Sequence, residues 1–256
     1  MEKKRNWTRE ETLIALYLYY TIPFQKVSKG NKTIQSYAAL INRTPSALGM
    51  KIGNLGRFDP TLKAQNISGL SNGSKMDEMV WREFEGQWEK LDKEFQSALA
   101  EFDAKRNFDT AVCEKIDFKI KNTERLAMIS VRANQNFFRA SVLAAYNNQC
   151  CITGIDLPEL LVASHIKPWK SDEANRLNPK NGLCLNALHD KAFDRGLLTL
   201  ENDFRLIFSP KLHQVNSDGF EKMFKPYEGK SIRLPERLEP DLSFIEYHRT
   251  HIFVSR

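Results

Sequence analysis

The chain has 256 residues, of which 41% are hydrophobic, and its formal net charge is +6. No stretch reaches the roughly 20 consecutive apolar residues of a transmembrane helix, and the opening residues MEKKRNWTREE lack the apolar core of a signal peptide. We therefore expect a cytoplasmic protein without a membrane span, whose four cysteines are reduced. The positive charge is compatible with a nucleic acid as partner.

The positive charge is concentrated at the N-terminal end. Residues 1–74 contain 11 Lys and Arg but only 4 Asp and Glu. Thr8 and Glu11 have the spacing of a capping box, and the apolar run ETLIALYLYY predicts the first helix. A second helix is predicted over TIQSYAALI, and a third begins with Thr44 as its N-cap and Pro45 in the first helical position.

The second and third predicted helices have the spacing of a helix-turn-helix. Ala38 is small enough for close helix approach, Asn42 can adopt the left-handed turn conformation, and Leu48 lies where the third helix must pack. An apolar residue would suit position 51 better than the lysine found there. If the motif binds DNA, the residues nearest to the groove and the phosphates are Arg43, Ser46, Lys51 and Arg57. The alternative is a helical packing module that does not contact DNA.

Residues 75–124 are predicted to form a long helix followed by a connector. From Lys75 to about Lys105, apolar residues recur at steps of three or four, namely Met76, Val80, Phe84, Trp88, Leu91, Phe95, Leu99 and Phe102. The interval 75–110 has 6 basic and 10 acidic residues, which would keep the opposite face of the helix in water. The apolar stripe either packs against the flanking domains or forms a homodimer interface.

Two strands and a helix are predicted within the C-terminal region, residues 125–256. LLVASHI is typical of a short strand with His165 near its end, and NGLCL is typical of a second strand. NALHDKAFD then begins a helix with Asn186 as its cap. We expect Asp194 and Arg195 to pair at the end of this helix.

Three segments of this region carry polar residues in a fixed order. SHIKPW contains His165, NPKNGLCL contains Asn181, and LHDKAFDRGL contains His189 and Asp190. This pattern resembles the HNH endonuclease signature. RANQNFFRASVLAAYNNQCCITG and YHRTHIF resemble the branch found in bacterial restriction endonucleases, so the resemblance covers about residues 125–256. It implies a C-terminal ββα-metal nuclease domain. Together with the helices predicted from the residue patterns, we expect an α+β protein with a mainly helical N-terminal region, a long connecting helix and this C-terminal domain.

The resemblance implies metal-dependent hydrolysis of phosphodiester bonds, which needs a base to activate water and a cation to neutralise charge on the phosphate. His165 is suited to be the base, because neutral imidazole is abundant near pH 7. Asn181 would orient the loop beside it through backbone hydrogen bonds. The helix supplies Asp190 or His189 as a metal ligand, and alignment on FDRG favours Asp190. Ser164 stands where many family members have an Asp ligand, and the donor set favours Mg²⁺ or Mn²⁺.

Residues that flank the signature add two expectations. Gly154 occupies the place of the second cysteine of a CxxC zinc motif, and Cys184 has no CxxC of its own, so we expect no structural zinc. Arg132 and Arg139 lie on a predicted helix that leads into the ββα segment. Their side chains either contact DNA phosphates or face solvent.

The sequence therefore predicts a DNA-recognition domain at residues 1–74, a helix and connector at residues 75–124, and a nuclease domain at residues 125–256. We expect a metal-dependent DNA endonuclease of a restriction or defence system. The alternative is a DNA-binding regulator with an inactive HNH-like finger, since Ser164 replaces the expected Asp. RNA cleavage would use the same chemistry, but the sequence contains no recognisable RNA-binding module.

Overall fold

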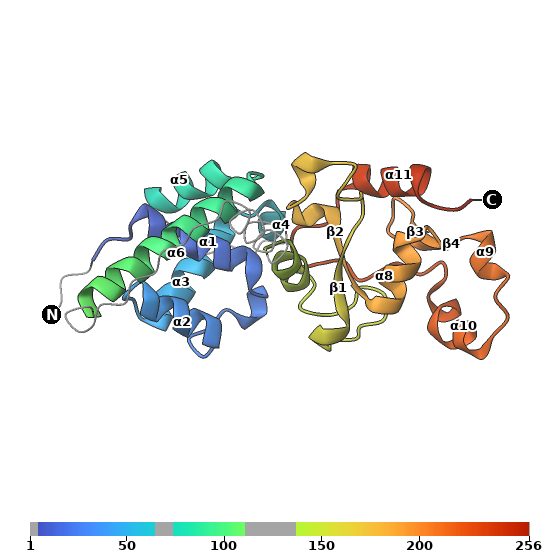
Figure 1. The fold of residues 1–256 in the computed structure, drawn as a ribbon, viewed down its shortest axis with the longest axis horizontal. Coiled ribbons are helices and arrows are strands. Elements are labelled where there is room, and N and C mark those ends of the chain that lie inside the picture. Colours follow the sequence, from blue (N-terminus) through green and yellow to red (C-terminus); the bar gives the residue numbers. More distant parts are fainter. Residues whose placement is uncertain (1–4, 65–73, 111–136, 256) are drawn as a thin grey trace, which may run out of the picture. The chain divides into compact units, whose positions relative to one another are not determined.

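The computed structural model describes residues 5–64, 74–110 and 137–255, except for the side chains of residues 105–110. The chain divides into two compact units, Met1–Phe137 and Phe138–Arg256, called the N-terminal and the C-terminal unit below. In these described residues helices dominate and the strands form two short antiparallel pairs, which is consistent with the α+β class (Figure 1). The predicted boundary between residues 124 and 125 lies outside the described residues. No helix in these ranges has the length and apolar character needed to cross a membrane.

The described part of the N-terminal unit consists of helices packed around α1. Its helices are α1 (Arg9–Thr21), α2 (Lys32–Leu40), α3 (Pro45–Leu55), α4 (Pro60–Ala64), α5 (Lys75–Phe84) and α6 (Trp88–Thr110), with 3-10 turns at Phe24–Lys26 and Gly56–Phe58. α1 contacts α3, α5 and α6, and its residues from Glu11 to Tyr20 are all buried. The capping box predicted at Thr8 and Glu11 is confirmed, and it starts this central helix.

The turn between α2 and α3 has the conformation that the sequence predicts. Asn42 lies in the left-handed region with a φ of 51°. The Thr44 side chain caps α3 by accepting a hydrogen bond from the amide of Ala47 at 3.2 Å. Ala38 and Leu48 are both 0% exposed, because α2 and α3 pack against each other.

The segment from Lys75 to Lys105, for which the sequence predicts one helix, forms two. α5 ends where the amide of Glu85 donates to the carbonyl of Trp81 at 2.9 Å, and Gly86 follows with a φ of 73°. Glycine reaches this left-handed conformation at little cost, so the chain turns although the apolar spacing continues. Both helices pack against α1, so the segment is part of the N-terminal core rather than a connecting helix.

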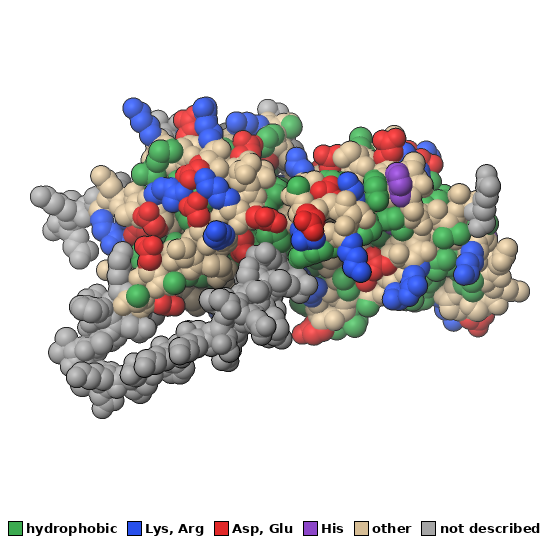
Figure 2. Space-filling view, turned by 45° about the horizontal axis from the view of Figure 1, so that its top comes forward, with side chains coloured by type: hydrophobic (Ala, Val, Ile, Leu, Met, Phe, Trp, Pro, Cys, Tyr) green, Lys and Arg blue, Asp and Glu red, His purple; other side chains and the backbone are tan. Residues whose placement is uncertain are grey.

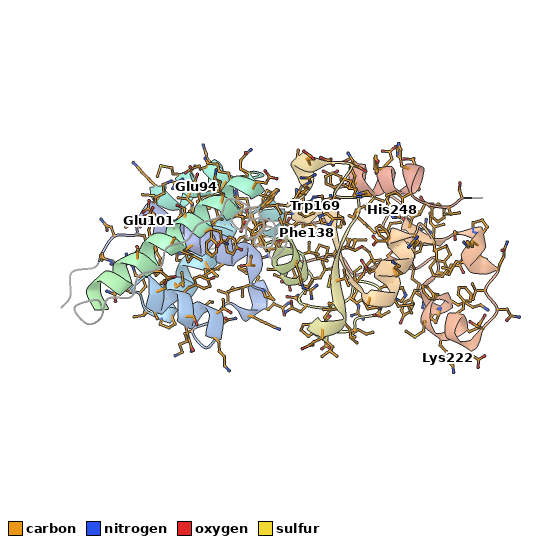
Figure 3. All side chains as sticks on the ribbon, in the orientation of Figure 1. Glu94, Glu101, Phe138, Trp169, Lys222 and His248 are labelled. Carbon is orange, nitrogen blue, oxygen red and sulfur yellow. The ribbon has the colours of Figure 1, made fainter. Side chains whose placement is uncertain are left out.

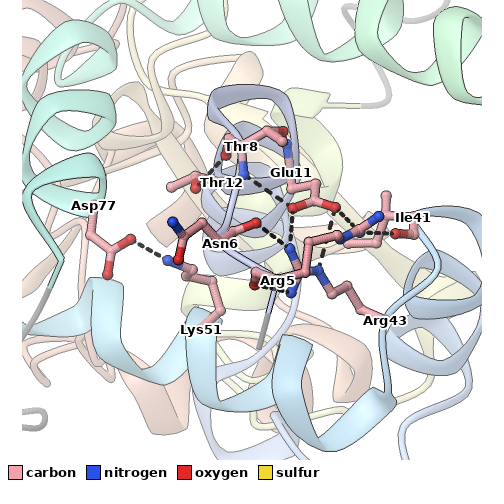
Figure 4. A network of polar contacts seen from close by, with 9 residues as sticks. All are labelled: Arg5, Asn6, Thr8, Glu11, Thr12, Ile41, Arg43, Lys51 and Asp77. Carbon is pink, nitrogen blue, oxygen red and sulfur yellow. Dashed lines mark hydrogen bonds and ion pairs between the residues drawn. The ribbon is translucent and has the colours of Figure 1, made fainter. Parts of the chain in front are cut away.

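Two of the predicted DNA contacts, Arg43 and Lys51, are held inside the N-terminal unit (Figure 4). Nη2 of Arg43 donates to Glu11, which is 1% exposed, at 2.7 Å. Lys51 forms a buried ion pair with Asp77. Both cations also lie over the ring of Trp7, at 4.5 and 4.7 Å from its centroid. Each of these two side chains is thus paired within its own unit, and their predicted contact with DNA stays a prediction.

The C-terminal unit contains the predicted order of strand, strand and helix. After a helix over residues 137–145, its elements are β1 (Leu161–His165), β2 (Gly182–Asn186), α8 (Ala187–Asp194), β3 (Leu198–Leu200), β4 (Leu206–Phe208), α9 (Pro210–His213), α10 (Asp218–Met223) and α11 (Leu242–His251), with 3-10 turns at Pro158–Leu160, Glu173–Asn175, Pro179–Asn181 and Lys225–Tyr227. β1 pairs antiparallel with β2, and β3 with β4. α8 packs against β1, β2 and β3, and α11 packs against β3 (Figure 1).

Candidate active site

The β1–β2 hairpin and α8 form the frame of the candidate site. β1 ends at His165, which lies opposite Gly182, the first residue of β2. A Cβ atom at Gly182 would lie 2.4 Å from Cγ2 of Val142, so a larger residue would push the preceding helix away from the hairpin. The side chain of Asn186 then caps α8 by accepting from the amide of His189 at 3.0 Å. The helix therefore starts directly at the end of β2 and runs beside β1.

The ring of His165 is fixed in orientation and in tautomer. It stacks on Phe138 with 3.8 Å between ring centroids, and it meets the Trp169 ring edge-on at 5.6 Å (both are labelled in Figure 3). Nε2 lies 3.0 Å from the backbone carbonyl of Arg176. Because a carbonyl only accepts, Nε2 carries the proton and Nδ1 keeps its lone pair in the neutral ring. Burial lowers the pKa of His165, which favours this neutral form.

Asn181 holds the loop that follows His165. Its side chain is buried, with Oδ1 accepting from the amide of Lys167 at 2.8 Å and Nδ2 donating to the carbonyl of Lys167 at 3.0 Å. Its own backbone carbonyl accepts from the amide of Ile166 at 2.9 Å. These bonds fix the two residues next to His165 in the chain. They are the kind of backbone contact that the resemblance implies for Asn181.

A cavity of about 390 Å³ brings several of the predicted chemical groups together. Ser164 and His165 line it from β1, and Asp190 lines it from α8. The rest of the wall comes from Val162, Ala163, Ile166, Pro168, Trp169, Lys170, Asp194, His248 and Ile252. A potential base, a carboxylate and a hydroxyl thus share one space.

His189 and Asp190 are neighbours in sequence, but their side chains have different surroundings. His189 is 0% exposed, its Nδ1 lies 2.9 Å from Nδ2 of Asn186, and its ring contacts the rings of Phe224 and Tyr227. It does not line the cavity that contains His165, whereas Asp190 does. Of the two alternatives that the sequence leaves open, only Asp190 is placed beside the potential base.

The polar groups beside His165 suit a hard divalent cation. Burial raises the pKa of Asp190, the charge of Asp194 adds to this effect, and the nearby Ser164 hydroxyl opposes it. Oγ of Ser164 is buried and has no hydrogen-bond partner of normal geometry in the described part of the chain. A cation would stabilise the carboxylate and give the orphaned hydroxyl a partner. The described residues contain no group of three or more His, Cys, Asp or Glu placed to hold a metal ion, so water and phosphate oxygens would complete its coordination.

His248 also lines this cavity, and it is predicted to make the C-terminal unit sensitive to acid. Nε2 donates to the carbonyl of Phe193 at 3.1 Å, and Nδ1 therefore accepts from the hydroxyl of Thr199 at 2.9 Å. Burial lowers the pKa of His248 from 6.5 to about 4. The unfolded chain therefore binds the proton more readily, and we expect the free energy of unfolding to fall by about 3 kcal/mol as the pH drops through this window.

Urea denaturation between pH 7.5 and 4.5 measures this effect. The His248→Gln variant should lose part of the acid dependence, whereas His251→Gln, at an exposed position of the same helix, should retain all of it. Equal acid dependence in wild type and His248→Gln would contradict the assigned burial of a neutral ring.

The cysteines near β1 and β2 lie in the core. Cys151 and Cys184 are buried, and burial raises the pKa of Cys184 to about 12. Gly154 has a φ of 78°, and a Cβ atom there would lie 2.3 Å from Nη1 of Arg233. The guanidinium thus occupies the space that a cysteine side chain at position 154 would need.

The remaining predicted DNA contacts differ in accessibility. Ser46 is exposed on α3, and Arg57 lies over the ring of Phe58. Arg139 is exposed but donates to the carbonyls of Leu161 and Pro158, and Arg132 lies outside the described residues. On the face drawn in Figure 2, the Lys and Arg side chains are interspersed with Asp and Glu.

Two features of the site are not among the predicted site residues. The carbonyl of Arg176 fixes the tautomer of His165, and a backbone group leaves no signal in the sequence. Asp194 lines the cavity, while Arg195 lines a different one, so the two do not pair at the helix end as expected. Asp194 follows Asp190 by four residues, a spacing that places both on one face of a helix. This spacing is the signal in the sequence that could have identified Asp194 as a residue of the site.

Comparison with known proteins agrees with this geometry. Residues 150–201 match the family model described as HNH endonuclease. A search of curated proteins found no match. The matched segment contains both strands of the hairpin, α8 and the three residues His165, Asn181 and Asp190. Its presence indicates a nuclease. Residues 150–201 are thus similar to the HNH endonuclease family, and this match supports the resemblance found in the sequence.

Proposed function

We propose that the protein is a metal-dependent endonuclease that hydrolyses phosphodiester bonds in DNA. One observation carries the proposal, namely that His165 and Asp190 line the same cavity while Nε2 of His165 is committed to the carbonyl of Arg176. Nδ1 is then the ring nitrogen left to accept a proton. A proton acceptor beside an oxygen donor for a cation is the combination that phosphodiester hydrolysis requires.

In the proposed mechanism, His165 removes a proton from the attacking water through Nδ1. Asn181 keeps the ring in place by fixing the loop that follows it. Asp190 and Ser164 would hold the divalent cation, with Mg²⁺ or Mn²⁺ favoured by the oxygen donors. When bound, that ion supplies positive charge to the scissile phosphate and to the departing 3′ oxygen. One such site cuts one strand, so a double-strand break needs a homodimer or two binding events.

We further propose that the N-terminal unit selects the target, as in a restriction or defence nuclease that acts on modified or foreign DNA. The support is the basic surplus of residues 1–74 and the pair of helices joined at Asn42, whose α3 exposes Ser46. Ser46 and Arg57 are the contacts that we propose. Ser46→Ala combined with Arg57→Ala should change the positions at which the protein cuts DNA or the affinity with which it binds DNA. Unchanged cleavage positions and affinity would contradict this role.

A plasmid assay tests the catalytic proposal. We expect wild-type protein to nick supercoiled DNA in Mg²⁺ or Mn²⁺ and to be inactive in EDTA, because removal of the ion leaves charge on the phosphate uncompensated. Unmodified and cytosine-methylated plasmids are compared to define the target, and an RNA of matched sequence tests the alternative substrate. Cleavage that persists in EDTA would contradict the mechanism.

A DNA-binding regulator is the second candidate, because Ser164 is a weaker ligand than the Asp for which it stands. In that case DNA would be bound but not cut in Mg²⁺, Mn²⁺ or Ni²⁺, and His165→Ala would bind DNA as the wild type does. Metal-dependent nicking by the wild type would eliminate this candidate.

A further inference from the structure

A second cavity of the C-terminal unit lies on another face of α8. Its volume of about 420 Å³ is within the range of about 300–1,000 Å³ that is typical of pockets for small molecules. Residues of α8, α9 and α10 line it, and these helices lie next to one another in Figure 1. Ser164, His165 and Asp190 line the other cavity and not this one. The second cavity is therefore separate from the candidate active site.

Most of the wall of this cavity is apolar. Leu188 of α8, Val215 in the loop before α10 and Met223 of α10 are 44%, 42% and 40% exposed. Large apolar side chains that are exposed together around one hollow are typical of a binding surface. The other apolar residues of the wall are Ala192, Leu197, Leu212, Phe220 and Phe224. An apolar ligand would remove this surface from water, which is favourable.

The charged side chains of this cavity are both cations. Lys191 and Arg195 are exposed on α8 and lie four residues apart, on one side of the helix. Neither forms an ion pair with another described residue, and no acidic residue is among the described residues of the wall. Asp190 and Asp194 of the same helix line the other cavity. The charge that complements this wall is therefore negative.

We propose that the second cavity binds a small apolar carboxylate, that is, a molecule with an acyl chain or an aromatic ring and one carboxylate group. The apolar body fits the space between α8 and α10, and the carboxylate accepts hydrogen bonds from Lys191 and Arg195. A neutral molecule with the same body gains only the apolar part of the interaction. This binding site goes beyond the proposed function, because none of its residues takes part in the proposed hydrolysis.

Calorimetric titration of the full-length protein with octanoate tests the inference, with octanol and octyltrimethylammonium as ligands of the same chain length. We expect one octanoate to bind per chain, about 10-fold or more tightly than octanol, and octyltrimethylammonium to bind more weakly still. Arg195→Gln should raise the Kd for octanoate about 10-fold, as expected for the loss of a hydrogen bond to a charged group. It should leave the Kd for octanol unchanged.

Two further variants separate the cavity from the general charge of the surface. Lys211→Gln removes a cation from an exposed position on α9 that does not line the cavity, and it should keep the wild-type Kd. Val215→Asp places a carboxylate on the wall at a partly exposed position, and it should weaken octanoate binding about 10-fold or more. Thermal unfolding without ligand checks that each variant is folded.

Several results would overturn this inference. The site does not select a carboxylate if octanol binds the wild type as tightly as octanoate does, or if Arg195→Gln binds octanoate as the wild type does. A wild-type dimer in sedimentation that Val215→Asp dissociates would show that a second copy of the chain covers the cavity. Weaker DNA binding by Arg195→Gln, with no octanoate binding by the wild type, would assign the cation to a phosphate. The nicking assay decides the proposed nuclease activity independently of all these measurements.

Discussion

Replacement of His165 by glutamine is expected to slow plasmid nicking by about 100-fold or more, since a positioned base typically contributes a factor of about 100 to 10,000. Glutamine keeps a polar side chain of similar length in the position beside Phe138 and can still donate to the carbonyl of Arg176. It cannot take a proton from water. The measurement is the single-turnover rate of nicking in Mn²⁺, and His165→Ala should be at least as impaired.

The matched control for this prediction is His213→Gln. His213 is half-exposed at the end of α9 and contacts Glu228, outside the cavity that contains His165. This variant should nick DNA at the wild-type rate. If His165→Gln and His213→Gln were equally active, proton removal by His165 would be the wrong mechanism, whatever the metal dependence.

Replacement of Lys51 by alanine is expected to lower the free energy of unfolding of the N-terminal unit by about 3–5 kcal/mol. The carboxylate of Asp77 is 2% exposed, and the substitution would leave it buried without its cation. Urea denaturation measures the loss. Lys63→Ala, which removes an exposed lysine of the same unit, should change the stability little.

A second variant distinguishes between two roles of Lys51, namely stabilising the fold through its ion pair and contacting DNA. Lys51→Met combined with Asp77→Leu removes both charges and keeps apolar volume, so it should recover much of the stability that Lys51→Ala loses. It should also keep the DNA affinity of the wild type. A Lys51→Ala protein that is as stable as the wild type but binds DNA more weakly would instead support the helix-turn-helix prediction for Lys51.

Local features of this fold could be predicted from the sequence because they depend on neighbouring residues. The capping box at Thr8 and the left-handed turn at Asn42 each involve interactions within a few positions. The order of β1, β2 and α8 follows from strand and helix patterns that the chain carries in sequence. His165, Asn181 and the adjacent pair His189 and Asp190 could be selected for the same reason, since the signature gives their order along the chain.

Features that depend on distant partners could not be predicted. The lysine at position 51 is explained only by Asp77, which lies 26 residues further along the chain. The apolar spacing of 75–105 continues across Gly86, so the pattern cannot distinguish one helix from two. The choice between His189 and Asp190 depends on which side of α8 faces β1, and the counting of residues leaves that open.

The central claim is that His165 acts as the base and Asp190 holds the cation within one cavity. The most direct test of these two separate roles is calorimetry with Mn²⁺ on the His165→Gln variant, which is expected not to nick DNA. The measurement gives the affinity of this variant for Mn²⁺. We predict that His165→Gln binds Mn²⁺ as the wild type does, whereas Asp190→Asn loses about 10-fold or more in affinity. If His165→Gln instead lost Mn²⁺ affinity to the same extent as Asp190→Asn, His165 would be a metal ligand and its role as the base would be contradicted.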